Sequence, residues 1–135
     1  RLAMLEAYQH VDIALDPFPY PGGTTSMEAL WMAVPIVTRR GTHFLSHLGE
    51  SILHNAGLPD WIASDDDDYV DIARRFASDV DALAALRGRL RQQVVNSPLY
   101  DARRFARHFE DAVWGMFHEK SKKLAEAGGV PQGEQ

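Results

Sequence analysis

The segment Gly22-Gly23-Thr24-Thr25 combines residue types that can bind a phosphate without a lysine. It stands between a short apolar run at 11–16 and a run with helical spacing that starts near Met27. If a strand enters this turn and a helix leaves it, bare backbone N–H groups and the positive end of a helix dipole meet there. The two glycines allow close approach, and the two threonine hydroxyls add donors. The turn is therefore a predicted diphosphate site.

Glu28 follows within the predicted helix, where its carboxylate could accept hydrogen bonds from a ribose diol beside the phosphate. The same residues also allow a purely structural interpretation. Thr25-Ser26-Met27-Glu28 matches a capping box, in which the first and last side chains each satisfy a backbone N–H. The local pattern by itself favours the cap. Neither the Walker A pattern nor Gly-x-Gly-x-x-Gly is present, so ATPase and dinucleotide-binding functions lose their usual support.

The elements that must position this turn alternate between strands and helices. Prolines at 17, 19 and 21 end the first strand, and Pro35 ends the helix that begins after Gly23. Further strands are expected at 35–38 and 61–63, with helices around 45–53 and 69–76. The spacing then predicts only helices, at 83–94 and 105–117. This order predicts an α/β fold, a partial Rossmann-like three-layer parallel sheet with a helical C-terminal extension. We expect a domain over 1–120 and a flexible tail over 121–135.

The bulk composition excludes several classes of function. The formal net charge of −5 and the lack of a dense basic patch argue against a nucleic-acid partner. No apolar run approaches the roughly 18 residues of a membrane span, and the first residues lack the layout of a signal peptide. With no cysteine, thiolate metal sites are excluded as well. We therefore expect a cytoplasmic protein without a membrane association.

Three further patterns have two interpretations each. His43 and His47 have a metal-ligand spacing, but no third ligand is apparent, so no metal is expected. The acidic run 65–68 lacks the glycine and distal glutamate of a calcium loop, and it is better explained as the cap of a helix. The regular stripe Phe105, Phe109, Val113 and Phe117 predicts a packing face, which on an isolated chain could drive self-association.

A longer pattern surrounds the turn. The matching residues are Val11 to Asp16, Phe18-Pro19-Tyr20, Gly22, Thr24-Thr25, Glu28, Leu30-Trp31, Pro35 and Val37-Thr38. In this pattern the chain resembles the O-GlcNAc transferase and SPINDLY family of glycosyltransferases. The resemblance continues through Gly41, Ser51, Gly57-Leu58, Tyr69, Ala77-Ser78-Asp79, Leu86-Arg87 and Ser97-Pro98, and it covers roughly residues 5 to 118. Coverage of this extent is much more specific than any short motif.

The resemblance implies an inverting GT-B enzyme that transfers a sugar such as GlcNAc from a nucleotide-sugar to a protein acceptor. In that family Gly22 to Thr25 would hold the donor diphosphate and Glu28 the ribose, with no further cofactor. Animal relatives place a histidine at Gly23, so the donor is open between a UDP-sugar, which is favoured, and GDP-fucose. Asparagine-modifying relatives share His47, which makes it a weak site candidate. The N-terminal GT-B domain, tetratricopeptide repeats and several donor contacts would lie upstream of Arg1, so the chain alone should be inactive.

Two other functions stay open at this stage. The chain could be a catalytically silent module that keeps the fold and binds a nucleotide or protein, and the departure at Gly23 is the only support for this function. Alternatively, Asp16 stands at the end of a strand, as the phosphorylated aspartate of a signalling receiver domain does. A receiver also needs an acidic pair on an earlier strand and a lysine near a later strand, and no lysine occurs before Lys120.

Overall fold

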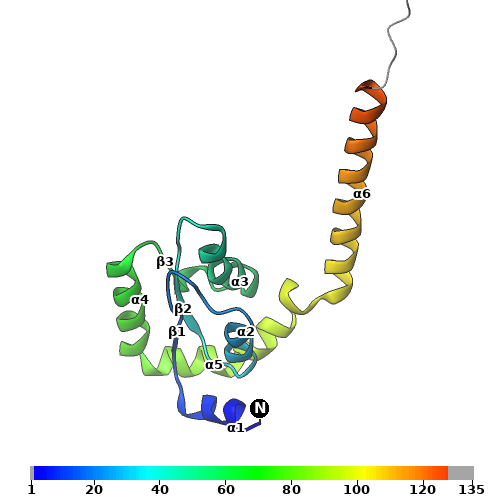
Figure 1. Ribbon diagram of the computed structural model, residues 1–135. Coiled ribbons are helices and arrows are strands. Elements are labelled where there is room, and N and C mark those ends of the chain that lie inside the picture. Colours follow the sequence, from blue (N-terminus) through cyan, green and yellow to red (C-terminus); the bar gives the residue numbers. More distant parts are fainter. Residues whose placement is uncertain (1, 128–135) are drawn as a thin grey trace, which may run out of the picture. The chain divides into compact units, whose positions relative to one another are not determined.

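The computed structural model describes residues 2–127 of the chain (Figure 1). These residues fall into two compact units, with the boundary after Tyr100. The first unit contains a small sheet and five helices, and the second contains one long helix. The predicted domain of 1–120 therefore ends about a helix later than the first compact unit does.

Three short parallel strands form the centre of the first unit. They are β1 (Ala14–Leu15), β2 (Ile36–Arg39) and β3 (Ile62–Ala63), in the spatial order β1-β2-β3. Ala14 is aligned with Ile36, and Thr38 with Ile62. The sheet confirms the expected parallel α/β arrangement, and all three carboxyl ends point to one edge.

Helices cover both faces of this sheet. The helices of the first unit are α1 (Leu2–Ala7), α2 (Thr24–Trp31), α3 (Leu48–Ala56), α4 (Asp66–Ser78) and α5 (Val80–Val95), of which α2, α3 and α4 cover the faces. Short 3-10 turns occur at Tyr8–His10, Phe44–His47, Pro59–Trp61 and Pro98–Tyr100. Figure 1 shows α4 on one side of the strands and α2 and α3 on the other, which gives the three predicted layers.

The core lies where α2, α3 and α5 pack around the sheet. Its largest fully buried aliphatic side chains are Leu30, Leu53, Leu90, Val34, Val37 and Val94. Helix α5 packs at the amino ends of the strands, because Arg87 pairs with Asp12 ahead of β1 and donates to the carbonyl of Ala33 ahead of β2, at 3.1 Å. The carboxyl ends of the strands are thereby left to the loops that carry the predicted site.

Two helix boundaries follow local rules. Helix α3 ends at Ala56, and its C-cap Gly57 has a φ of 74°, the left-handed conformation that glycine adopts without a steric penalty. Helix α4 begins after Asp65, whose side chain accepts the backbone N–H of Asp68 at 2.9 Å. The acidic run therefore caps a helix, as the sequence predicts, and its charges lie at the positive end of the helix dipole.

Helix α6 (Ala102–Ala127) makes up the described part of the second unit. It continues seven residues into the predicted tail of 121–135, and residues 128–135 lie outside the described residues. Lys123 pairs with Glu119 at 2.6 Å and Lys122 with Glu126 at 4.0 Å, both one turn apart, which favours the longer helix. None of the helices described in 2–127 is long and apolar enough to cross a lipid bilayer.

Candidate functional site

The predicted phosphate turn lies between the carboxyl end of β1 and the start of α2. Gly23 is the N-cap residue, and the first N–H bonded within the helix is that of Met27, which donates to the Gly23 carbonyl at 3.0 Å. The N–H groups of Thr24 and Thr25 therefore precede the first intrahelical bond, and both threonines are exposed. Exposed N–H and hydroxyl donors at a helix start form the arrangement that binds an anion.

The capping-box interpretation of this segment is wrong. The N-cap residue is Gly23 rather than Thr25, and no side chain makes a cap hydrogen bond to α2. Thr25 is already the second helical residue, so its hydroxyl does not close the helix end. The reason is that the helix begins at Thr24, one residue ahead of Thr25, with Gly23 as its N-cap. The local pattern favoured the cap, and the structure leaves both hydroxyls beside the open N–H groups instead.

The two glycines of the turn differ in what they do. The N–H of Gly22 donates to Asp16 Oδ1 at 2.7 Å, so this N–H is occupied in the structure. A Cβ at Gly22 would lie 2.4 Å from Ser26 Oγ and 2.7 Å from Thr25 Oγ1, which excludes any side chain without rearrangement. A Cβ at Gly23 would meet only Leu48 Cδ2, at an ordinary 3.4 Å. Gly22 is required for the shape of the turn, whereas Gly23 has space for a side chain.

A buried carboxylate, Asp16, holds the turn in place. It is only 4% exposed, at the residue after β1. In addition to the Gly22 bond, Oδ1 lies 3.4 Å from the donating hydroxyl of Ser26, and Oδ2 accepts the hydroxyl of Thr38 at 2.7 Å. Asp16 thereby joins the turn, the first turn of α2 and strand β2.

Burial dominates the acidity of this group. Loss of hydration raises the pKa of Asp16, and the hydrogen bonds from Gly22, Thr38 and Ser26 act in the opposite direction without cancelling that effect. Helix α3 closes over the carboxylate, since a Cβ at Gly49 would lie 2.6 Å from Oδ2. A receiver aspartate must meet its phosphodonor at the surface, so this enclosure argues against the receiver interpretation.

Aromatic contacts fix the proline-rich loop that follows Asp16. The hydroxyl of Tyr69 in α4 donates to the Asp16 carbonyl at 2.9 Å. Its ring meets Phe18 edge-on, with centroids 5.4 Å apart, and the Arg39 guanidinium lies 5.0 Å from the centre of the Phe18 ring. Burial, and then the nearby Asp16, raise the pKa of Tyr69, so its hydroxyl remains a donor at neutral pH. The loop is thus held from β1, β2 and α4.

Glu28 lies four residues after Thr24 on α2, so the two side chains share a face of the helix. It is half-buried, and its own backbone carbonyl accepts the N–H of Met32 at 3.0 Å. This placement puts the carboxylate one helical turn from the exposed threonines. The structure therefore places both predicted residues on one face of α2.

His47 belongs to a separate group of charges around Glu50. Its Nδ1 lies 2.8 Å from Glu50 Oε2, while Arg40 approaches Oε1 at 2.7 Å and His54 at 3.8 Å. The hydrogen bond from His47 is the main reason that the pKa of Glu50 is lowered, and the charge of Arg40 adds to it. Leu48, the residue after His47, is the side chain nearest to Gly23. His47 is thus adjacent to the turn along the chain, with one ring nitrogen committed to Glu50.

The role of Asp16 is the feature that sequence reasoning missed. Its partners lie 6, 10 and 22 residues away, and no short motif links them. The available signal was an acidic residue at the end of an apolar strand, followed at a distance by small residues, Gly22 and Gly49. Small residues are needed at both positions because the carboxylate occupies the space that their side chains would take.

Comparison with known proteins identifies the family. The model of glycosyl transferase family 41 matches residues 5–109. The chain belongs to this family. A SPINDLY protein of Hordeum vulgare, named as a probable UDP-N-acetylglucosamine–peptide N-acetylglucosaminyltransferase, is 43% identical to this family 41 chain over 114 residues. A peptide N-acetylglucosaminyltransferase of Caenorhabditis elegans is 32% identical over 109 residues.

The family 41 chain is a small part of these relatives. The match to the Hordeum vulgare protein covers 84% of this chain and 12% of that protein. The match to the Caenorhabditis elegans protein covers 81% of this chain and 10% of that protein. Among solved structures, a mutant of the Thermobaculum terrenum O-GlcNAc transferase superposes with a TM-score of 0.84 at 36% identity, over 92% of this chain and 24% of that one. The expected family and the partial GT-B fold are both confirmed.

Proposed function

We propose that this chain supplies the donor-binding part of a family 41 glycosyltransferase. The donor is a nucleotide-sugar, with UDP-GlcNAc favoured, and the acceptor is a protein. Transfer inverts the anomeric carbon. The observation that carries the proposal is the start of α2, where exposed Thr24 and Thr25 present hydroxyl and N–H donors beside a turn locked by Asp16. The names and substrates of the matched relatives support the same reaction class.

The turn would act mainly on the leaving group. As the sugar departs, negative charge grows on the diphosphate, and fixed donors at a helix start stabilise that charge without reorganising. Thr24 and Thr25 supply these donors, Gly23 allows the phosphate to approach, and Gly22 maintains the shape of the turn through its bond to Asp16. Glu28, one helical turn away, would bind the ribose. Neither metal nor organic cofactor is needed for this assignment.

The remaining parts of the proposed enzyme would lie outside this chain. This chain spans 12% of the Hordeum vulgare relative and 10% of the Caenorhabditis elegans relative. An acceptor-activating base, contacts to the base of the nucleotide, a facing GT-B domain and tetratricopeptide repeats would be supplied by other segments of the proposed enzyme. We propose that the chain alone is inactive for this reason. A cytoplasmic location fits this function.

Calorimetric titration of the full-length protein with UDP and with GDP tests the proposal. UDP should bind, and Thr24→Val and Thr25→Val should each weaken binding by roughly tenfold, since each removes a hydroxyl bond to a charged group. Ser121→Ala on α6 serves as a control, because it also removes an exposed hydroxyl. Tighter binding of GDP would reassign the donor. Absence of binding by both nucleotides would overturn the proposed donor-binding function.

A further inference from the structure

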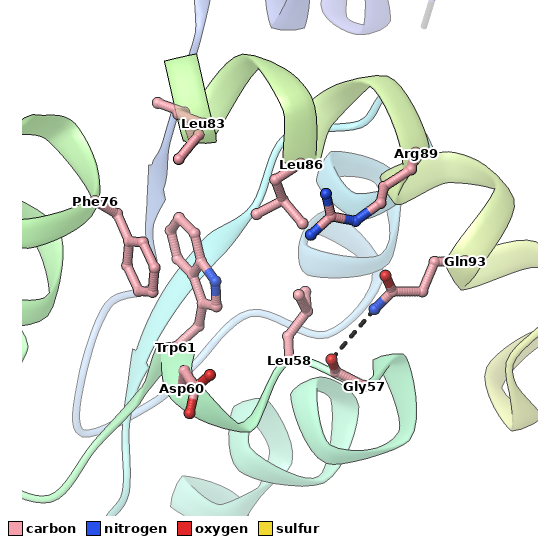
Figure 2. Close-up of a pocket in the computed structure, with 10 residues that line it drawn as sticks. Gly57, Leu58, Asp60, Trp61, Phe76, Leu83, Leu86, Arg89 and Gln93 are labelled. Atoms are coloured by element: carbon pink, nitrogen blue, oxygen red, sulfur yellow. Dashed lines mark hydrogen bonds between the residues drawn. The ribbon is translucent and has the colours of Figure 1, made fainter. Parts of the chain in front are cut away.

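A cavity of about 250 Å³ lies at the opposite end of the sheet from the phosphate turn. It opens between α5, the end of α4 and the segment that joins α3 to β3, ahead of the amino end of that strand (Figure 2). Its apolar wall is made by Leu58, Leu83 and Leu86. Trp61 forms one side and is stacked on Phe76, with ring centroids 3.9 Å apart and planes 4° from parallel.

Two hydrogen-bond donors at this cavity lack an acceptor within residues 2–127. Trp61 is 3% exposed, and its indole N–H makes no hydrogen bond to a described residue. Figure 2 shows the indole nitrogen on the side that faces Leu58 and Leu86. Arg89 extends its guanidinium over the same space, and it too forms no hydrogen bond or ion pair with the described part of the chain. Arg89 is exposed and the indole N–H of Trp61 opens onto the cavity, so both donors are available to an acceptor that enters it.

The other polar groups at the rim are already committed or lie apart. The Gln93 amide donates to the carbonyls of Ala56 at 2.8 Å and Gly57 at 3.2 Å, as the dashed line to Gly57 in Figure 2 shows in part. Asp60 carries the only negative charge that lines the cavity among the described residues. Figure 2 places its carboxylate beyond Trp61, away from Arg89. The two donors, from Trp61 and Arg89, therefore lie on one side of the cavity and the Asp60 carboxylate lies on the other.

We propose that this cavity binds an apolar carboxylate. The carboxylate accepts hydrogen bonds from Arg89 and from the indole N–H of Trp61, and a branched or aromatic body lies on Leu58, Leu83 and Leu86. The volume is slightly below that of usual drug-sized pockets, which limits the occupant to a small ring or a single residue. The same chemistry occurs in a free small acid and in the C-terminal residue of a polypeptide. This site is independent of the donor turn, because it stands at the amino end of the strands.

Fluorine NMR of protein labelled with 5-fluorotryptophan tests the assignment with phenylacetate as the probe. The Trp61 resonance is identified as the one lost in Trp61→Phe, and independently by elimination with Trp31→Phe and Trp114→Phe. Phenylacetate should shift this resonance saturably, with a Kd of about 1 mM, as expected for a small ligand with one charged contact. Phenylacetamide, which has the same shape without the charge, should bind roughly tenfold more weakly.

Arg89→Gln should weaken phenylacetate binding by roughly tenfold, since it removes the charge-assisted bond. Arg103→Gln on α6 makes the same change of net charge and should leave the affinity unaltered. The tripeptide Gly-Gly-Phe decides between the two sources. If it binds more tightly than phenylacetate, the natural ligand is a polypeptide C-terminus; if it binds more weakly, the ligand is a free acid. An unshifted Trp61 signal at about 20 mM phenylacetate, or equal affinity in Arg89→Gln, would overturn the proposal.

Discussion

Two carboxylates near the carboxyl edge of the sheet have opposite surroundings. Asp16 is buried among neutral donors, and burial raises its pKa. Glu50 is approached by Arg40 and His47, whose side chains are about half exposed, and its pKa is lowered. The first group is enclosed by backbone and small residues, so it sets the shape of the turn. The second belongs to a hydrated charge network, so it adjusts electrostatics without fixing the fold.

Removal of the Asp16 side chain should have the largest effect. Asp16→Ala leaves the N–H of Gly22 and the hydroxyl of Thr38 without their acceptor, and it should lower the free energy of unfolding by about 3 kcal/mol. Urea denaturation measures the loss. Asp71→Ala, an exposed carboxylate on α4, should change stability by less than about 0.5 kcal/mol. Equal effects of the two variants would show that the Asp16 network does not hold the turn.

Crowding of the same carboxylate should have the next largest effect. In Gly49→Ala the new Cβ would lie 2.1 Å from Thr38 Oγ1 and 2.6 Å from Asp16 Oδ2, so the helix must move. We expect a loss of about 2 kcal/mol in the free energy of unfolding, the usual cost of an overpacked site. Gly88→Ala is the matched control, because its Cβ meets nothing within 4 Å and α5 should gain about 0.5–1 kcal/mol. An unchanged free energy of unfolding in Gly49→Ala would contradict the close packing at this position.

The pH dependence of Asp16→Asn tests the sign of the Asp16 shift. Because burial raises the pKa, the native state keeps a proton on Asp16 to higher pH than the unfolded chain does. Its contribution to stability is therefore fully present below the unfolded pKa and is lost as pH rises through the folded pKa. Asparagine does not titrate, so the variant does not lose this stability. As pH rises from the unfolded pKa to the folded pKa of Asp16, the free energy of unfolding of the parent should therefore fall relative to that of the variant. Denaturation curves at several pH values measure this difference, and a change in the parent's favour would reverse the assignment.

Glu50→Gln should show the opposite trend with the smallest amplitude. Its lowered pKa means that the stabilisation is present above the unfolded carboxyl pKa and is lost as pH falls through the folded pKa. Since Arg40 and His47 are well hydrated, we expect about 0.5–1 kcal/mol near neutral pH. Chemical denaturation with and without salt measures this difference in stability between parent and variant, and salt should reduce the difference. Glu110→Gln on α6 controls for the change in net charge, and an effect of the same size there would discount the network.

Local sequence rules were sufficient for the order of the elements and for several boundaries. The strand–turn–helix around Gly22, the end of α3 at Gly57 and the start of α4 after Asp65 each depend on residues close in the chain. Helix α2 ends earlier than the apolar spacing predicts, at Trp31. Ala33 adopts a φ of 60°, and its carbonyl accepts Arg87 from α5. That bond spans 54 residues, so local spacing gave no sign of it.

The candidate site divides in the same way. Thr24, Thr25 and Glu28 could be chosen from the sequence because one turn and one helix position them. The hydrogen bond from Gly22 to Asp16 could not be predicted from the sequence. It requires the carboxyl end of β1, Thr38 and Gly49 to meet in space. Trp61 was expected at the start of a strand, and it is buried in the core. Pro59 instead starts a 3-10 turn there, and that turn presents the indole N–H to a cavity.

Helix α6 exposes every side chain from 102 to 126, including the apolar stripe of Phe105, Phe109, Val113 and Phe117. A helix gains most of its stability from packing one face, so the amides of α6 should exchange with deuterium much faster than those of α5, whose leucines are buried. Any surface that covers the stripe will slow this exchange. Deuterium uptake over 102–126 therefore reports whether another surface covers α6, and the same experiment measures the exchange of the buried core for comparison.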